Sequence, residues 1–145
     1  MPKWVVDGYQ EFSKRLPVEC KLKLVEIAPG RRSKSAAVKR AIQDESSRML
    51  AAIPKSAKVV ALDERGKLWT TRQLAAQLEE WMSEGRDISL LVGGPDGLSD
   101  ECRARAEQQW SLSPLTLPHA MVRVLLAEQL YRAWSVMKGH PYHRD

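Results

Sequence analysis

The sequence predicts an α/β fold in which helices flank a mostly parallel β-sheet. Two observations predict it: short apolar runs alternate with amphipathic segments, and the clearest run, Ile88–Val92 (ISLLV), is apolar at nearly every position. Such runs are typical of strands covered on both faces, as in a parallel sheet. Strands that alternate with helices build α/β folds. The 145 residues contain no repeat, low-complexity tract or linker, so we expect a single domain over residues 1–145.

The predicted helices are recognised by apolar residues that recur every three or four positions. Pro17 ends the predicted helix that begins at Trp4. Thr70 or Thr71 can cap the predicted helix over residues 71–84, and Gly85 ends it. Ser99 can cap the fourth. The last predicted helix is apolar around most of its circumference, which indicates burial in the protein or against a second subunit. The predicted helices cover residues 4–15, about 35–52, 71–84, 99–109 and 120–138.

Further strands are expected on both sides of these helices. Apolar residues at Val18, Cys20, Leu22 and Leu24 alternate with charged ones, and a period of two predicts a strand over residues 18–24. The run KVVALD at 58–63 predicts a short buried strand, and residues 112–117 predict a short extended segment interrupted by a proline.

Composition restricts the function only loosely. Lys and Arg total 23 against 18 Asp and Glu, for a net charge of +5. This excess suits a polyanion such as RNA without proving one. No run approaches the roughly 18 apolar residues that span a bilayer, and the start has no signal-peptide pattern, so we expect a cytosolic protein without a membrane partner. Cys20 and Cys102 have no metal-type spacing and are expected to be reduced.

A glycine-rich turn, Gly93-Gly94-Pro95-Asp96-Gly97-Leu98, directly follows the ISLLV strand. Ligands of α/β sheets bind beyond the carboxyl ends of the strands, and glycines there let the backbone approach a ligand. The turn is neither G-x-G-x-x-G nor a P-loop. By itself it is equally compatible with an empty strand-to-helix turn.

Residues 110–119 (WSLSPLTLPH) mix small, polar and proline residues with apolar ones. The segment could form an irregular wall for an adenine ring, or an ordinary edge strand leading into a helix. His119 and Arg123 lie one helical turn apart and could hold a phosphate or a polarised carbonyl, although a histidine near a helix start is more often structural.

The tail and one basic segment offer two further candidates. His140 and His143 lack further metal ligands, so no metal is expected. Tyr142, flanked by His143 and Arg144, could stack on a flipped base and contact phosphate, or the tail could be disordered. Similarly, the basic stretch that begins with Arg31, Arg32 and Lys34 is either a phosphate-contacting patch or a solvated helix start.

Three strings, SLLVGGPDGLS, EQQWSLSPLTLPHAMVRVLLAEQLYRAW and HPYHRD, closely resemble the bacterial RlmH (YbeA) family of the SPOUT superfamily. The resemblance runs from Met1 to Asp145 and is densest toward the C-terminus. It implies a methyltransferase that modifies N3 of a pseudouridine in a hairpin loop of 23S ribosomal RNA, within the assembled ribosome. It also implies S-adenosylmethionine as cofactor, an α/β knot in which the C-terminal segment threads through a loop, and a homodimer packed through the C-terminal helices.

The same resemblance implies roles for individual residues. The tail is expected to reach the active site of the partner subunit. Candidates for catalysis and substrate handling are His119, Arg123, Tyr142, His143 and Arg144, and RNA contacts are assigned to Arg31, Arg32 and Lys34. The residues expected around the cofactor are Leu62, Gly93, Gly94, Leu112, Ser113, Pro114, Leu115, Thr116 and Leu117, with Gly97 and Leu98 supporting the turn.

Two departures from the family pattern bear on these expectations. Asp96 stands where the family often has Glu, which shortens the reach of that carboxylate. Family members usually have a segment before Met-Pro-x-Trp that forms a first strand, so that strand is expected to be absent here. The alternative function is therefore a ribosome-associated RNA-binding protein with impaired catalysis. A nucleotide-dependent oxidoreductase is disfavoured, because no acidic ribose-binding residue follows the turn at the expected offset.

Overall fold

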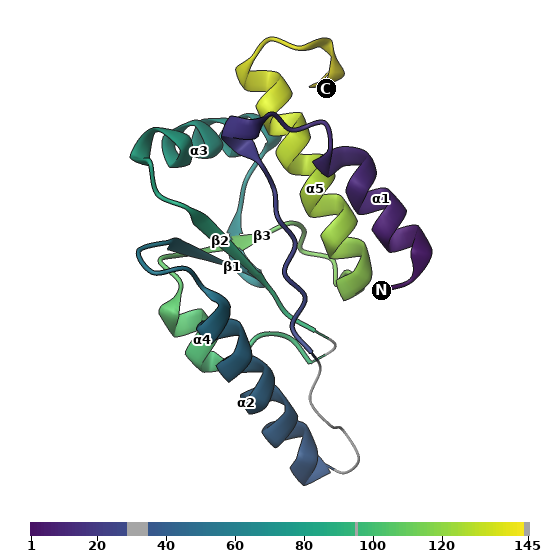
Figure 1. The fold of residues 1–145 in the computed structure, drawn as a ribbon, viewed down its shortest axis with the longest axis vertical. Helices are drawn as coiled ribbons and strands as arrows, with labels where there is room; N and C mark the ends of the chain where they lie inside the picture. Colours follow the sequence, from purple (N-terminus) through teal and green to yellow (C-terminus); the bar gives the residue numbers. More distant parts are fainter. Residues whose placement is uncertain (29–34, 95, 144–145) are drawn as a thin grey trace.

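Three parallel strands form the sheet of the structure, a computed structural model that describes residues 1–28, 35–94 and 96–143 (Figure 1). The strands are β1 (Lys58–Leu68), β2 (Ile88–Val92) and β3 (Gln108–Ser111), in the order β2-β1-β3. β1 is central and pairs in parallel with both neighbours. The predicted α/β fold with a parallel sheet is therefore confirmed. Threading of the C-terminal segment into a knot stays a prediction.

The helices begin and end close to the predicted positions, except for α4. The Thr70 hydroxyl accepts a hydrogen bond from the Gln73 backbone N–H, and the Gln73 side chain accepts one from the Thr70 N–H. Gly85 ends the same helix in the left-handed conformation, with φ of 71°. The helices are α1 (Lys3–Ser13), α2 (Ser35–Ala52), α3 (Thr71–Glu84), α4 (Asp100–Arg105) and α5 (His119–Met137), with 3-10 turns η1 (Val18–Cys20) and η2 (Pro141–His143).

Helices cover both faces of the sheet because successive side chains of β1 point to opposite faces. Val60 packs into a cluster with α3 and α5, which contains the buried Trp81 and Trp110. Val59 and Ala61 pack on the other side with residues of α4 and, at its edge, of α2. Figure 1 shows α3, α5 and α1 on one side of the strands and α2 with α4 on the other. This two-sided burial explains why residues 59–62 of β1 and most of β2 are apolar at successive positions.

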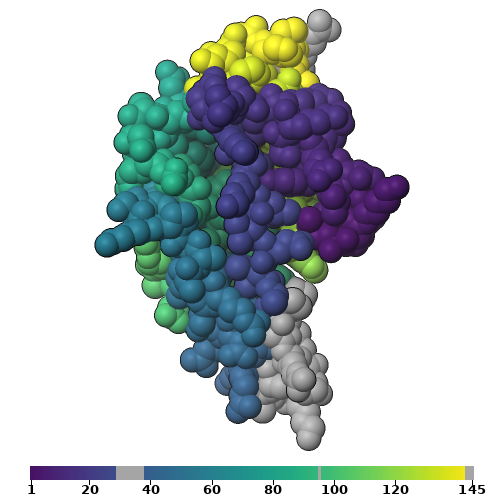
Figure 2. Space-filling view, viewed as in Figure 1, coloured from purple at the N-terminus to yellow at the C-terminus, as the bar shows by residue number. Residues whose placement is uncertain are grey.

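The predicted strand at residues 18–24 is wrong. Residues 18–20 form η1, and 21–28 continue in an extended course without joining the sheet, because no described backbone hydrogen bond links them to a strand. A cavity of about 520 Å³ is lined by residues 21–25 and 27 on one side and by β2 on the other. The alternation of apolar and charged residues does match the burial, since Leu22 is half-buried and Lys23 is exposed. It arises because one side of this extended segment is covered, and not because the segment pairs with a strand. In Figure 2 this segment runs down the visible face.

The predicted helix at residues 99–109 is too long. α4 ends at Arg105, because Ala106 is extended (ψ of 136°), and Gln108 to Ser111 then form β3. The Glu107 N–H donates to the Val59 carbonyl, which places the chain beside β1. In this strand only Trp110 and Ser111 are buried, so it gives no apolar run in the sequence.

Candidate functional site

The carboxyl ends of the three described strands meet at one edge of the sheet. In the ladders, Leu62 of β1 is paired with Val92 of β2 and with Trp110 of β3. The segments that follow these residues therefore converge, and they enclose a cavity of about 870 Å³. A cavity of this size at this edge is typical of ligand sites in α/β proteins.

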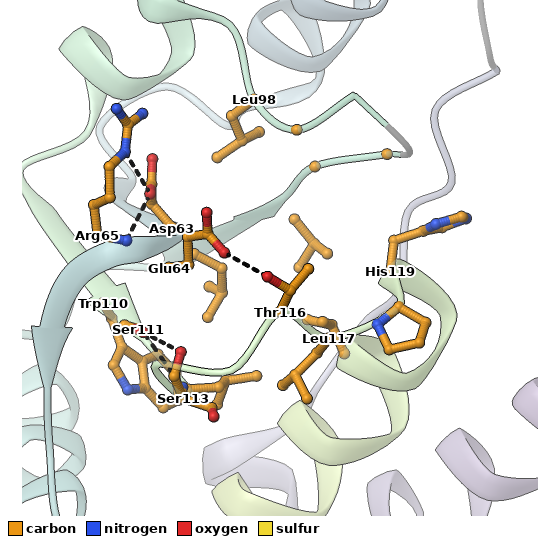
Figure 3. A pocket seen from close by; sticks show the side chains of 18 of the residues that line it. Asp63, Glu64, Arg65, Leu98, Trp110, Ser111, Ser113, Thr116, Leu117 and His119 are labelled. Atoms are coloured by element: carbon orange, nitrogen blue, oxygen red, sulfur yellow. Dashed lines mark hydrogen bonds and ion pairs between the residues drawn. The ribbon is translucent and has the colours of Figure 1, made fainter.

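One wall of the cavity is an excursion of β1. The ladder with β3 shifts register between Leu62 and Lys67, both of which pair with Trp110. At Gly66, β1 again lies directly beside β3. A Cβ added to Gly66 would lie 2.7 Å from the Gln109 carbonyl carbon. The excursion carries Asp63, Glu64 and Arg65 to the cavity, where Figure 3 shows them across from His119.

In this excursion, Asp63 is the residue whose negative charge is balanced by neighbouring groups of the protein. Its side chain is only 8% exposed, and its carboxylate accepts a 2.9 Å hydrogen bond from the Arg65 N–H. The Arg103 guanidinium lies 3.7 Å away. Burial alone would raise the pKa of Asp63, but the hydrogen bonds from Arg65 and the charges of Arg65 and Arg103 together lower it. Asp63 is therefore ionised at neutral pH and tied to its neighbours.

The glycine turn forms the second wall and closes tightly on itself. A Cβ on Gly93 would lie 2.6 Å from the Gly97 carbonyl carbon and 2.8 Å from the Leu98 nitrogen, so Gly93 has no room for a side chain. Gly97 has φ of +78°, which favours glycine. Its N–H donates to the Gly94 carbonyl over 3.0 Å. The turn thus presents backbone to the cavity.

The third wall is the loop that follows β3, and serine side chains hold its irregular course. The Ser111 hydroxyl donates to the Ser113 carbonyl over 2.9 Å, and the Ser113 hydroxyl accepts from the Leu115 N–H, also over 2.9 Å. The Thr116 hydroxyl donates to Glu64 over 3.3 Å, which joins this loop to the β1 excursion (Figure 3). An irregular wall, one of the two predicted forms of the segment, is the observed one.

The cavity brings together most of the residues expected to surround a cofactor. Pro114 lies in the same loop but outside the lining. The sequence analysis did not identify Arg103 or the β1 excursion, and the position of the excursion directly after Leu62, at the end of the predicted strand KVVALD, is the signal that could have indicated it. The expected residues that do line the cavity are Leu62, Gly93, Gly94, Leu112, Ser113, Leu115, Thr116 and Leu117, together with His119.

The structure does not bring the other candidates to this cavity. Arg123 forms a 2.8 Å ion pair with Glu26 and lines the cavity beside β2. Tyr142 lies beyond the opposite end of α5, a helix whose 19 residues span about 28 Å. Arg31, Arg32, Lys34 and Arg144 lie outside the described residues, as does the side chain of His143.

Two negative findings apply to the part of the chain that the structure describes. There, no group of three or more His, Cys, Asp or Glu side chains is arranged to hold a metal ion. None of its helices has the length and apolar character needed to cross a membrane.

The fold and the site together define an α/β protein with a ligand cavity beyond the carboxyl ends of parallel strands, walled by a glycine turn and a serine-braced loop. A sequence model of one family, described as a predicted SPOUT methyltransferase, matches residues 1–143. The chain belongs to this SPOUT methyltransferase family.

Two curated relatives are similar over nearly the whole chain. The ribosomal RNA large subunit methyltransferase H of Methylococcus capsulatus is 58% identical over 144 residues, which cover 99% of this chain and 93% of that protein. The protein of the same name from Thioalkalivibrio sulfidiphilus is 57% identical over 145 residues, covering 100% and 93%. The resemblance to the RlmH family is thereby confirmed.

Proposed function

We propose that this chain transfers a methyl group from S-adenosylmethionine to large-subunit ribosomal RNA, at N3 of a pseudouridine in a hairpin loop of the 23S RNA. One observation carries the proposal: in a chain 57–58% identical to the two named methyltransferases, the glycine turn and the loop after β3 line one cavity. We propose the assembled ribosome as the substrate and the cytoplasm as the place of action.

The residues of the cavity fit an adenosyl cofactor. Gly93 and Gly97 present backbone to the cavity, and the loop from Leu112 to Leu117 supplies apolar side chains beside backbone groups able to read an adenine edge. The carboxylate of Glu64, which accepts a hydrogen bond from Thr116, suits a ligand that carries positive charge. When bound, the cofactor supplies a methyl group on an electrophilic sulfonium.

The protein must position the RNA nitrogen and dispose of its proton. N3 of a pseudouridine carries a proton that has to leave before the nitrogen lone pair can attack. His119, at the start of α5, is the histidine that lines the cavity, and we assign it the role of proton acceptor. Arg123 is engaged by Glu26, so its role at the substrate depends on release of that pair.

Tyr142, His143 and Arg144 act, in this proposal, on the cavity of a second copy. The length of α5 separates Tyr142 from the cavity of its own subunit, which favours action of the tail on the cavity of a partner. We therefore propose a homodimer packed through α5. Mixing a Gly93→Ala subunit with a Tyr142→Ala subunit should restore activity, because one site of the mixed dimer has an intact cavity and an intact tail. Failure of the mixture, with both variants folded, would argue against shared sites.

The function is tested with purified protein, S-adenosylmethionine and ribosomes that lack the modification. Mass spectrometry of the 23S RNA should show one added methyl group on the hairpin pseudouridine. RNA binding should weaken steeply with salt, because phosphate contacts dominate affinity. Calorimetry with S-adenosylmethionine alone distinguishes the methyltransferase from the alternative function. Intact RNA binding without cofactor binding would favour an RNA-binding protein with impaired catalysis.

A further inference from the structure

Arg103 of α4 is a cavity residue that the proposed reaction does not use. Its side chain is 23% exposed, and its guanidinium lies at the junction of two cavity walls. One nitrogen, Nη1, donates to the Leu98 carbonyl over 2.6 Å and lies 3.7 Å from the Asp63 carboxylate. The other, Nη2, donates to Asp100. Arg103 thus contacts the end of the glycine turn and the β1 excursion at once.

The contact with Leu98 extends to Gly93 through the packing of the turn. The Leu98 nitrogen and the Gly97 carbonyl carbon are the backbone atoms against which Gly93 packs, with no space for a Cβ between them. The Leu98 carbonyl held by Arg103 and the Gly97–Leu98 peptide packed on Gly93 lie on either side of the Leu98 Cα, so a shift at Leu98 should be transmitted to the wall that Gly93 presents to the cavity. Leu98 itself is buried with Cys102, which leaves the turn little freedom other than at its peptide groups.

The contact with Asp63 fixes the second wall. Asp63 follows Leu62 directly, and Leu62 is one of the residues expected to contact the cofactor. A carboxylate only 8% exposed requires compensating charge, and Arg103 adds to the charge and hydrogen bonds of Arg65 from a different element of the fold. The ion pair with Asp100 contributes little by comparison, because the Asp100 side chain is 98% exposed and solvent screens the pair.

We propose that Arg103 is a positioning residue, which sets the distance between the glycine turn and the β1 excursion and thereby the shape of the cofactor site. Both of its terminal nitrogens are used on protein acceptors, so it acts through Gly93 and Leu62 rather than on the ligand. A guanidinium suits this role because its planar fork holds two acceptors at a fixed angle, which a lysine ammonium does not. The inference rests on the proposed function.

The test compares Arg103→Gln and Arg103→Lys with the wild-type protein. Arg103→Gln should raise the dissociation constant for S-adenosylmethionine, measured by calorimetry, about tenfold, as expected for loss of a charged hydrogen bond. KM for the cofactor should rise with the dissociation constant. The kcat at saturating cofactor should stay within about threefold of wild type, because the substitution weakens cofactor binding and leaves the chemical step unchanged. Arg103→Lys, which keeps the charge, should recover part of the affinity.

A double-mutant cycle separates positioning from general stability. Asp63→Asn alone should weaken cofactor binding, and its combination with Arg103→Gln should cost less than the sum of the two changes, because both break one link. Arg105→Ala is the matched control, since Arg105 is an exposed arginine of the same helix. Its dissociation constant should equal that of the wild type.

Three results would overturn the inference. They are unchanged cofactor affinity in a folded Arg103→Gln protein, a loss confined to kcat, and full additivity with Asp63→Asn. Thermal unfolding without ligand is measured for every variant, and Arg103→Lys serves if Arg103→Gln fails to fold. A wild-type protein that binds no S-adenosylmethionine would refute the proposed function instead, so the two failures are distinguishable.

Discussion

The hydroxyl of Tyr142 donates a 2.7 Å hydrogen bond to the carboxylate of Glu128. Arg132 donates to the same carboxylate oxygen, and its guanidinium carbon lies 5.0 Å from the centre of the Tyr142 ring. Burial first, and then the hydrogen bond and the charge of Glu128, raise the pKa of Tyr142 from 10.0 to about 12. A neutral phenol therefore joins the described end of the chain to α5.

Replacing Tyr142 by Phe should lower the free energy of unfolding by about 1 kcal/mol at neutral pH, the usual value of one hydrogen bond. Because folding raises this pKa, the contribution is complete below pH 10 and disappears as the pH rises through 12. Urea unfolding of both proteins across this range should show the difference shrinking. Glu128→Gln should bring the pKa of Tyr142 down in an absorbance titration, and an unchanged pKa would contradict the assignment.

Gly93→Ala should destabilise the protein by about 2 kcal/mol or more, because the new Cβ would meet backbone atoms that cannot move aside independently. Gly94→Ala is the matched control for stability. A Cβ there meets only the Glu45 carboxylate oxygen, at 3.9 Å, and should change the unfolding free energy by less than about 0.5 kcal/mol. Equal urea midpoints for the two variants would show that the turn opens readily.

The ion pair of Arg123 with Glu26 should contribute about 0.2–1 kcal/mol, since both side chains are partly exposed. Either single replacement by Ala should remove this amount. The exchanged pair, Arg123→Glu with Glu26→Arg, should restore most of it in urea unfolding. If the exchanged protein is stable but no longer methylates RNA, Arg123 acts on the substrate as well as on Glu26. Additive losses in the single and double Ala variants would show that the two residues do not interact.

Trp81→Phe should lower the free energy of unfolding by about 2 kcal/mol or more, because it removes a partly buried hydrogen bond and leaves a small cavity around a buried side chain. The Trp81 indole N–H donates to Gln108 over 2.8 Å, and the Gln108 amide donates on to Gln77 over 2.9 Å. Trp4→Phe is the control, since Trp4 is 54% exposed. Similar unfolding free energies for the two variants would mean that the Trp81 contact adds nothing to packing.

The elements that could be predicted from the sequence are those with local signals. Thr70 and Gly85 mark the ends of α3, and ISLLV marks β2. β3 could not be predicted, because the four residues QQWS are mostly polar and become a strand only beside β1. The alternation in residues 21–24 indicated a covered side correctly, but a ladder also requires a neighbouring backbone, which the pattern cannot supply.

The candidate site was predictable to a similar extent. The position of the glycine turn after a buried strand placed it at the cavity, and the family resemblance placed the loop from Leu112 to Leu117 there. Asp63 escaped prediction because the excursion depends on the register shift between β1 and β3. The role of Arg103 could not be predicted, because its side chain extends from α4 to Leu98 and Asp63. Nothing local in the sequence distinguishes Arg103 from Arg105.

The extended course of residues 21–28 has a consequence for access to the outer strand of the sheet. β2 is an outer strand of the described sheet, and the backbone of an outer strand can recruit another chain. Residues 21–25 and 27 stand over β2 across the intervening cavity. Lys21 and Lys23 are exposed on this segment. A strand from a neighbouring molecule that approached β2 from this side would therefore meet the segment and its two lysines before it reached the β2 backbone.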